Sequence, residues 1–258
     1  MNKAEYLTSP LLSKAGFRHA FFTRGGGASE GPFRSLNFSV SVGDAPERVG
    51  ENLRRAASAL GVSPGELYFA AQVHGARTLV VRAGDDRERV ATLQADALVA
   101  ETPGVACAVR HADCVPILVG DRGSGAALAI HAGWRGLVAR VIAEGLAELR
   151  RVIGSAGDLV AAIGPHISLA SFEVSSDVAH ILREASPDAL VVDEGRAKPH
   201  VDLRRIARAL LREQGLAEES IDDVPGCTFA EEELFFSYRR DGAQSGRHLS
   251  AIVSRSPA

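Results

Sequence analysis

The stretch DALVAETPGVACAVRHADCVPILVGDRGSGAALAI, residues 96–130, contains four short apolar runs in succession, at 96–100, 105–109, 115–119 and 126–130. Within these runs the apolar residues are mostly consecutive instead of alternating, which is typical of strands buried on both faces. No helical pattern separates the runs, and this excludes a strictly alternating βαβ chain. We therefore predict an α+β fold in which a mixed β-sheet is covered by helices.

Further strands and four helices are predicted on either side of this stretch. Similar apolar or β-branched runs lie at 78–82, 159–163 and 248–253. Apolar periodicity and helix-boundary residues predict helices over 46–60, 136–153, 176–185 and 203–214. Asp44 is the candidate cap of the first helix. Because no internal repeat or Pro/Ser-rich linker divides the chain, residues 1–258 are expected to form a single domain.

The composition is ordinary for a folded protein: 258 residues, 46% hydrophobic and 24% charged, with a net charge of −3. These values exclude disordered and fibrous classes, and the slightly acidic balance argues against nucleic acid as a partner. The sequence shows neither a bilayer-spanning apolar run nor a signal-peptide pattern, so we expect a cytoplasmic protein that does not contact membranes. Three cysteines are too few for a disulfide scaffold.

Three short segments place a histidine or cysteine at the end of a predicted strand: QVHG (72–75), HADCVP (111–116) and HAGWRG (131–136). Their spacing is too wide for a zinc finger, so His74, Cys114 and His131 can meet only in the folded protein. Two imidazoles and a thiolate would give Zn²⁺ three ligands and leave one position open, as in catalytic zinc sites. The same residues also fit a Cys–His nucleophilic pair, and each taken singly fits an ordinary core residue.

These segments resemble signatures of the YfiH family, described first as polyphenol oxidases or laccase-domain proteins and later as purine nucleoside phosphorylases with adenosine deaminase activity. Other matching segments are FFTRGGGASEGPFRSLNFS (21–39), IGPHIS (163–168), FEV (172–174) and FFSYRRD (235–241). The resemblance implies an α/β/α sandwich and a zinc site of His74, Cys114 and His131, with one zinc per chain. Copper is a candidate replacement, because Cu²⁺ binds nitrogen and sulfur ligands more tightly than Zn²⁺. It also implies phosphorolysis of adenosine, inosine, guanosine or 5′-methylthioadenosine, and deamination of adenosine.

Other polar residues gain candidate roles from this resemblance. Asp113 is the candidate general acid or base, with positioning of the site as the alternative. Arg24, in a glycine-rich turn, is a candidate phosphate contact. Further candidates for contact with substrate or phosphate are Arg135, Arg239 and Arg240. A surface or structural ion pair is the alternative for each arginine. Trp134 is a candidate for stacking on a purine, with packing at the start of a helix as the alternative.

The chain departs from the family pattern at three positions. His111 stands where Thr is usual, His166 where a small residue or Cys is frequent, and Leu53 where Arg is frequent. These changes leave the substrate preference open. His111 is also a candidate fourth ligand, although strand alternation should point it away from the other three. Cys107 and Cys227 are expected to bind no metal and to form no disulfide.

Three other functions remain as alternatives. A cysteine or metal hydrolase that edits peptidoglycan precursors would use Cys114 as its nucleophile, and a zinc-stabilised binding protein would use the same site without catalysis. The third is a copper-dependent polyphenol oxidase. A four-copper centre needs many histidines in His-X-His pairs, whereas this chain has eight histidines and no such pair. The expected partners are a purine nucleoside and phosphate, and a homodimer is one option for the assembly.

Overall fold

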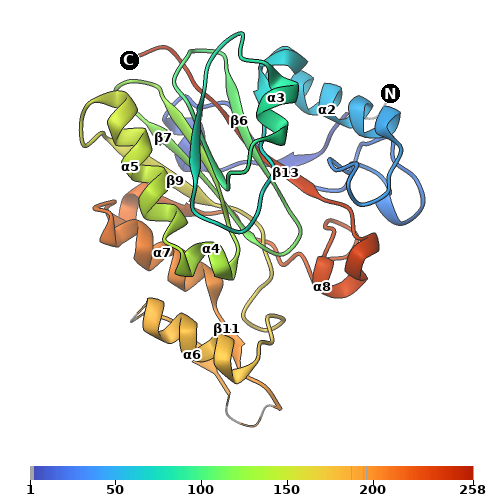
Figure 1. The fold of residues 1–258 in the computed structure, drawn as a ribbon, viewed down its shortest axis with the longest axis vertical. Helices are drawn as coiled ribbons and strands as arrows, with labels where there is room; N and C mark the ends of the chain where they lie inside the picture. The colour runs from blue at the N-terminus through green and yellow to red at the C-terminus, as the bar shows by residue number, and fades with distance from the viewer. Residues whose placement is uncertain (1–2, 187, 194, 196, 258) are drawn as a thin grey trace.

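Two mixed β-sheets pack against each other at the centre of the protein, and helices cover their outer faces (Figure 1). The computed structural model describes residues 3–186, 188–193, 195 and 197–257. The strand order of the six-stranded sheet is β12 (Ile221–Asp223), β9 (Leu159–Ile163), β7 (Val115–Asp121), β8 (Ala127–Ala132), β5 (Ala97–Ala100) and β4 (Thr78–Val81). The order of the five-stranded sheet is β1 (Tyr6–Leu7), β2 (His19–Phe22), β13 (His248–Val253), β6 (Ala106–His111) and β3 (Leu67–Tyr68).

Antiparallel pairing dominates both sheets, and parallel pairs occur only at the described sheet edges. Strand β3 runs parallel to β6, and β12 and β4 run parallel to β9 and β5. Strands β6 and β7 follow each other in the chain but belong to different sheets, so the turn 112–114 crosses from one sheet to the other. This crossing carries part of the candidate site.

Helices form the outer layers. Against the six-stranded sheet lie α4 (Trp134–Val138), α5 (Val141–Ile153) and α7 (Leu203–Glu213), and α6 (Ser176–Ala185) packs against α4. Against the five-stranded sheet lies α2 (Pro46–Leu60). The shorter elements are α1 (Pro10–Lys14), α3 (Arg87–Thr92), α8 (Tyr238–Asp241), the antiparallel pair β10 (Val191–Val192) and β11 (His200–Val201), and 3-10 turns at Gly31–Phe33, Pro64–Glu66, Glu218–Ser220 and Gly242–Gln244. None of the described helices is both long and apolar enough to cross a membrane.

The predicted class, mixed sheet structure flanked by helices, is confirmed, but the strands form two sheets instead of one. The second sheet was missed because a strand that is apolar on both faces gives the same sequence pattern whether a helix or another sheet covers it. Here Val109 of β6 and Leu118 of β7 share one apolar layer between the sheets, while Ile117 of β7 faces the helices. The order of layers is therefore helix, sheet, sheet, helix.

Helix boundaries agree closely with the sequence patterns at three of the four predicted helices. The predicted helix 136–153 is instead two helices, because Arg140 has φ 68° and ends the shorter one after a single turn or so. Asp44 also differs from its prediction: Ala45 is the N-cap of α2, and the Asp44 carboxylate accepts hydrogen bonds from Ser29 and Asn37. No glycine or proline marks the break at Arg140, so the apolar periodicity runs through it.

Candidate functional site

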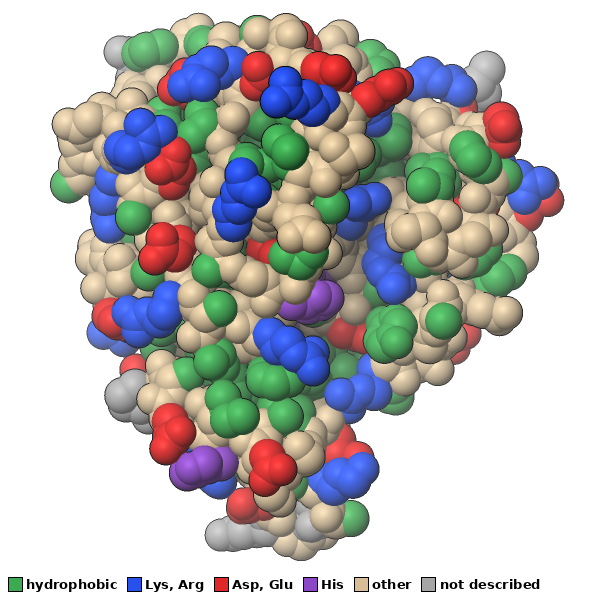
Figure 2. Space-filling model, viewed as in Figure 1, with side chains coloured by type: hydrophobic (Ala, Val, Ile, Leu, Met, Phe, Trp, Pro, Cys, Tyr) green, Lys and Arg blue, Asp and Glu red, His purple; other side chains and the backbone are tan. Residues whose placement is uncertain are grey.

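A cavity of about 600 Å³ opens where the two sheets meet, and it contains the three segments that the sequence singled out. Figure 2 shows a hollow on this face with a histidine inside it and basic side chains around it. Its wall includes all three predicted metal ligands, His74, Cys114 and His131. Residues of both sheets and of helices α4 and α8 contribute to it, so the cavity exists only in the folded chain.

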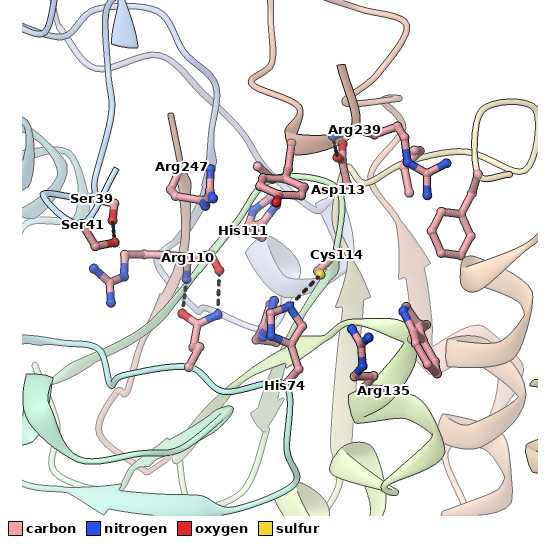
Figure 3. Close-up of a pocket in the computed structure, with 17 residues that line it drawn as sticks. Ser39, Ser41, His74, Arg110, His111, Asp113, Cys114, Arg135, Arg239 and Arg247 are labelled. Carbon is pink, nitrogen blue, oxygen red and sulfur yellow. Dashed lines mark hydrogen bonds between the residues drawn. The ribbon is translucent and has the colours of Figure 1, made fainter. Parts of the chain in front are cut away.

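The three predicted ligands come together as a cluster. His131 lies near the end of β8, Cys114 lies in the turn between β6 and β7, and His74 lies in the loop before β4. Their nearest ligand atoms all lie within 4.8 Å of one another, and Cys114 Sγ is 3.8 Å from His74 Nε2 (Figure 3). The group can therefore hold a metal ion.

A buried carboxylate that the sequence patterns did not reveal, Asp96, holds this cluster in place. Asp96 is fully buried and accepts hydrogen bonds from the backbone N–H groups of Val73, His74 and Gly75, at 3.2, 2.9 and 2.7 Å. Its Oδ1 also lies 2.8 Å from His131 Nδ1. One side chain thus fixes the loop of His74, where φ is 61°, and the ring orientation of His131. The only sequence signal is an acid at the start of a wholly apolar strand.

The charges of the cluster favour a thiolate. Burial raises the pKa of Cys114, but His131 and His74 outweigh burial and lower it below its ordinary value. Burial likewise lowers the pKa of His131, and the Cys114 thiolate together with Asp96 raises it above its ordinary value. The protein therefore stabilises the deprotonated form of Cys114, which is the form that binds metals.

The geometry of the cluster fits a tetrahedral metal ion. Bond lengths of about 2.0–2.1 Å to nitrogen and 2.3 Å to sulfur place these two atoms about 3.6 Å apart at a tetrahedral angle. The observed separation of Cys114 Sγ and His74 Nε2 is 3.8 Å. Because Asp96 engages Nδ1 of His131, the Nε2 atom of that ring is left for the metal. The donor set and its spacing therefore suit zinc.

Gly133 leaves the space that this cluster needs. A Cβ atom at Gly133 would lie 2.9 Å from Cys114 Sγ and 2.9 Å from His74 Cδ2. We expect Gly133→Ala to lower the affinity for zinc at least about tenfold by displacing these ligands. Its φ of −70° is available to alanine, so the effect should be steric alone. Zinc competition titrations measure it, with Gly50→Ala as control because a Cβ there has open space; equal affinities in the two variants would contradict it.

Asp113 lines the cavity, but both of its carboxylate oxygens are already engaged. Oδ1 accepts a hydrogen bond from Thr228 Oγ1 at 2.7 Å, and Oδ2 accepts one from the backbone N–H of Arg239 at 2.6 Å. The residue has φ 90° in the turn between the sheets. This arrangement supports the positioning alternative, in which Asp113 anchors the start of α8 over the cavity.

The predicted arginines lie in different places. Arg135 and Arg239 line the cavity, where their guanidinium groups stack on Trp134 at 4.4 Å and Phe172 at 5.3 Å. Arg24 is not among the residues that line it. The guanidinium of Arg24 stacks on a phenylalanine and donates to the carbonyls of residues 34 and 232. Arg24 therefore stabilises the N-terminal turn, and the structure does not support its prediction as a phosphate contact.

The remaining predicted residues contact other parts of the protein and lie outside the metal cluster. Arg240 donates to the carbonyls of residues 228, 229 and 235. Among the described residues, His111 is not part of the metal cluster; its Nε2 lies 2.8 Å from Ser250 Oγ. Cys107 and Cys227 are free thiols outside the cluster. Burial raises the pKa of Cys107 to about 12, so that thiol stays protonated.

His166 is a neutral histidine of the core, and it makes the protein sensitive to acid. Burial lowers the pKa of His166 to about 4, while its Nδ1 donates to the Gly164 carbonyl at 2.7 Å. Above pH 6.5 both folded and unfolded chains hold this group neutral, so its contribution to stability is complete. Between pH 6.5 and about 4 only the unfolded chain takes up the proton, so stability is lost as the pH falls.

We therefore expect His166→Gln to reduce the slope of unfolding free energy against pH by roughly 1 kcal/mol per pH unit between pH 6.5 and 5. Urea unfolding at several pH values measures the slope. His180 is exposed on α6, so His180→Gln is the control and should leave the slope as in the parent protein. A His166→Gln slope equal to the parent's would show that His166 is protonated in the folded protein.

Comparisons with known proteins agree with this architecture. Residues 18–255 match a family model described as multi-copper polyphenol oxidoreductase laccase. A Bacteroides thetaiotaomicron protein named purine nucleoside phosphorylase is 36% identical over 252 residues, covering 94% of this chain and 93% of its own. The Escherichia coli K12 protein named purine nucleoside phosphorylase YfiH is 38% identical over 232 residues, covering 89% and 90%.

Solved structures share the fold over nearly the whole chain. The crystal structure of YlmD from Geobacillus stearothermophilus has a TM-score of 0.87 at 30% identity and covers 99% of this chain and 100% of its own. That of a Bacillus licheniformis hypothetical protein YfiH has a TM-score of 0.83 at 32% identity and covers 92% of both. The arrangement of two sheets and their helices is thus one that solved relatives also have.

Proposed function

The chain belongs to the YfiH family, described as multi-copper polyphenol oxidoreductase laccase, and on this basis we propose that it is a zinc-dependent purine nucleoside phosphorylase. One observation carries the proposal: a metal-binding cluster of His74, Cys114 and His131 lies in the wall of a cavity large enough for a nucleoside. The relatives named purine nucleoside phosphorylase support the reaction class. We propose further that residues 1–258 form one catalytic domain.

In the proposed reaction an oxygen of phosphate forms a bond to C1′ of the nucleoside while the bond from C1′ to N9 breaks. The electron pair of that bond passes to the base, which takes up a proton, and the products are the free base and ribose-1-phosphate. Zinc held by His74, Cys114 and His131 would supply a fixed positive charge close to the reacting atoms. The protein's own task is to orient the two reactants and to stabilise negative charge.

The side chains around the cluster suit this task. Trp134 and Phe172 offer aromatic faces for a flat base, and Arg135 and Arg239, stacked on those faces, are placed to contact the nucleoside. Asp113 would position the start of α8 over the cavity, because both of its carboxylate oxygens already accept hydrogen bonds, from Thr228 and from the Arg239 backbone N–H.

Deamination of adenosine is the second proposed activity. The donor set of two imidazoles and one thiolate, with a fourth position open, is typical of hydrolytic zinc sites, and deaminases of nucleobases use histidine and cysteine ligands. Water would replace the amino group at C6, giving inosine and ammonia. The reaction also needs a free general acid or base. Because the Asp113 carboxylate is already engaged, we propose that deamination is slower than phosphorolysis.

Of the rival functions, the four-copper oxidase fits the site least well. In the described part of the chain His74, Cys114 and His131 are the one cluster of three potential ligands, and a four-copper centre needs many more. Copper can replace zinc on nitrogen and sulfur ligands, so weak oxidation of phenols by a copper-loaded protein is compatible with this proposal. A peptidoglycan-editing hydrolase would use the ionised Cys114 as nucleophile.

A single incubation distinguishes these functions. Purified protein is mixed with adenosine, with and without phosphate, and adenine is separated from inosine by chromatography. We expect adenine only with phosphate, and slower formation of inosine without it. Removal of metal by a chelator should abolish both products, and zinc should restore them. If adenosine, inosine, guanosine and methylthioadenosine all stay intact with zinc-loaded protein, the proposal is wrong.

A further inference from the structure

Arg110 and Arg247 form a pair of half-buried cations at one end of the cavity, opposite the end that carries Arg135 (Figure 3). Arg110 lies on β6; its guanidinium donates one hydrogen bond, to the Ala70 carbonyl at 3.2 Å, and stacks on Phe69 at 4.6 Å. Arg247 lies just before β13 and donates to the carbonyls of residues 245 and 246 from one nitrogen. A guanidinium carries five N–H donors, so both side chains keep several of them for a ligand.

No carboxylate forms an ion pair with either arginine in the part of the chain that the structure describes. Burial and the nearby charge of Arg247 lower the pKa of Arg110 to about 10, so the two cations repel each other. Asp113 and the Cys114 thiolate attract Arg247 from a distance, but the Asp113 oxygens are held by Thr228 and Arg239. Two half-buried cations that form no ion pair repel each other, and an anion between them would relieve that repulsion.

Hydroxyl groups line the same end of the cavity. Ser39 Oγ and Ser41 Oγ lie 2.8 Å apart and face the guanidinium of Arg110 (Figure 3). His111, also in the wall, has a buried Nδ1 atom with no hydrogen-bond partner in the described chain. Forked guanidinium donors together with hydroxyls are the groups that bind the tetrahedral oxygens of phosphate.

We propose that Arg110, Arg247, Ser39 and Ser41 form the subsite for inorganic phosphate. The proposal rests on the proposed function for the identity of the anion. It replaces Arg24, whose donors are used elsewhere, with residues that lie in the cavity. It also predicts how the two substrates are oriented in the cavity, with phosphate at one end and the base at the other.

The opposite end of the cavity suits the base. Trp134 and Phe172 offer aromatic faces there, and Ile167 adds an apolar surface. With phosphate at Arg110 and the base at Trp134, the bond between C1′ and N9 would lie between the two ends, where His74 and Cys114 are found. Phosphate would then approach C1′ from the side opposite the leaving base.

Calorimetric titration of the purified protein with inorganic phosphate tests this subsite without requiring turnover. The titration is run alone and with adenine present, so that ordered binding does not hide the site. We expect Arg110→Gln and Arg247→Gln each to raise the Kd for phosphate about tenfold or more. Arg48→Gln, at an arginine that pairs with Glu30 outside the cavity wall, should leave the Kd unchanged, and Arg135→Gln serves as the comparison at the other end of the cavity.

A second variant tests the subsite even if the arginine variants fail to fold. Ser39→Ala with Ser41→Ala removes only two hydroxyls and should raise the Kd for phosphate about threefold to tenfold. Each variant is checked by thermal unfolding without phosphate. Loss of phosphate binding in Arg135→Gln instead, or no binding by the parent protein at about 10 mM phosphate in either condition, would overturn the subsite. Binding with the expected pattern but no cleavage of nucleosides would leave the subsite standing and refute the proposed function.

Discussion

Cys114→Ala and His131→Ala are each expected to remove the bound metal and to lower the turnover of adenosine at least about a thousandfold. The physical reason is that each side chain is one of only three donors gathered within 4.8 Å, so the loss of one leaves two. Phosphorolysis and deamination should fall together, because both are proposed to use the same site. Metal content by mass spectrometry and product formation by chromatography measure the two effects.

Cys227→Ser is the matched control for this prediction. Cys227 accepts a hydrogen bond from the Ser168 backbone N–H, a contact that a serine oxygen can also make, and it lies outside the cluster. Its metal content and turnover should equal those of the parent protein. Full phosphorolysis by Cys114→Ala would show that the metal has only a structural role. Activity that survives a chelator but not alkylation of thiols would support the cysteine hydrolase instead.

Asp96→Asn is expected to lower the free energy of unfolding by about 3 kcal/mol and the affinity for zinc about 10–100-fold. The four groups that approach the Asp96 carboxylate include three backbone N–H donors, and all of them suit an acceptor. The side-chain NH2 group of an asparagine would face one of these donors and could not accept a hydrogen bond from it. His131 would also lose the charge that fixes its ring. Urea unfolding and zinc competition measure the two losses.

Asp121 offers a control for this substitution because it is a second buried carboxylate with a similar environment. It accepts hydrogen bonds from the backbone N–H groups of Ser124 and Asp158, both at 2.7 Å, and it lies outside the cavity wall. Asp121→Asn should therefore destabilise the protein without changing its affinity for zinc. If both variants lower stability and neither lowers the affinity for zinc, Asp96 supports the fold alone.

The central strands and three of the helices could be predicted from the sequence because their apolar patterns are local. The metal cluster could be predicted because its residues follow or precede predicted strands; in the structure His131 lies near the end of β8, Cys114 in the turn before β7 and His74 in the loop before β4. That they meet depends on the crossing between β6 and β7, which brings the edges of both sheets to one place. Their role as ligands remains a prediction.

Other features depend on contacts between distant segments, which leave no local pattern. Asp96 gave little sequence signal because its partners are backbone groups of another loop, and any residue type offers those. Arg24 was predicted as a phosphate contact because a glycine-rich turn resembles an anion-binding loop, whereas the structure places its guanidinium on the carbonyls of residues 34 and 232. Arg110 was overlooked for a similar reason: in sequence it is one charged residue directly after the apolar run 105–109.

The position of β13 has a consequence for how the chain folds during synthesis. Residues 248–253 form the strand that lies between β2 and β6 and pairs with both. Until the ribosome has made these residues, His19–Phe22 and Ala106–His111 have no partner between them, and the five-stranded sheet stays split. The nascent chain must therefore carry two unpaired, largely apolar strand edges for most of translation, a state open to aggregation and to capture by chaperones.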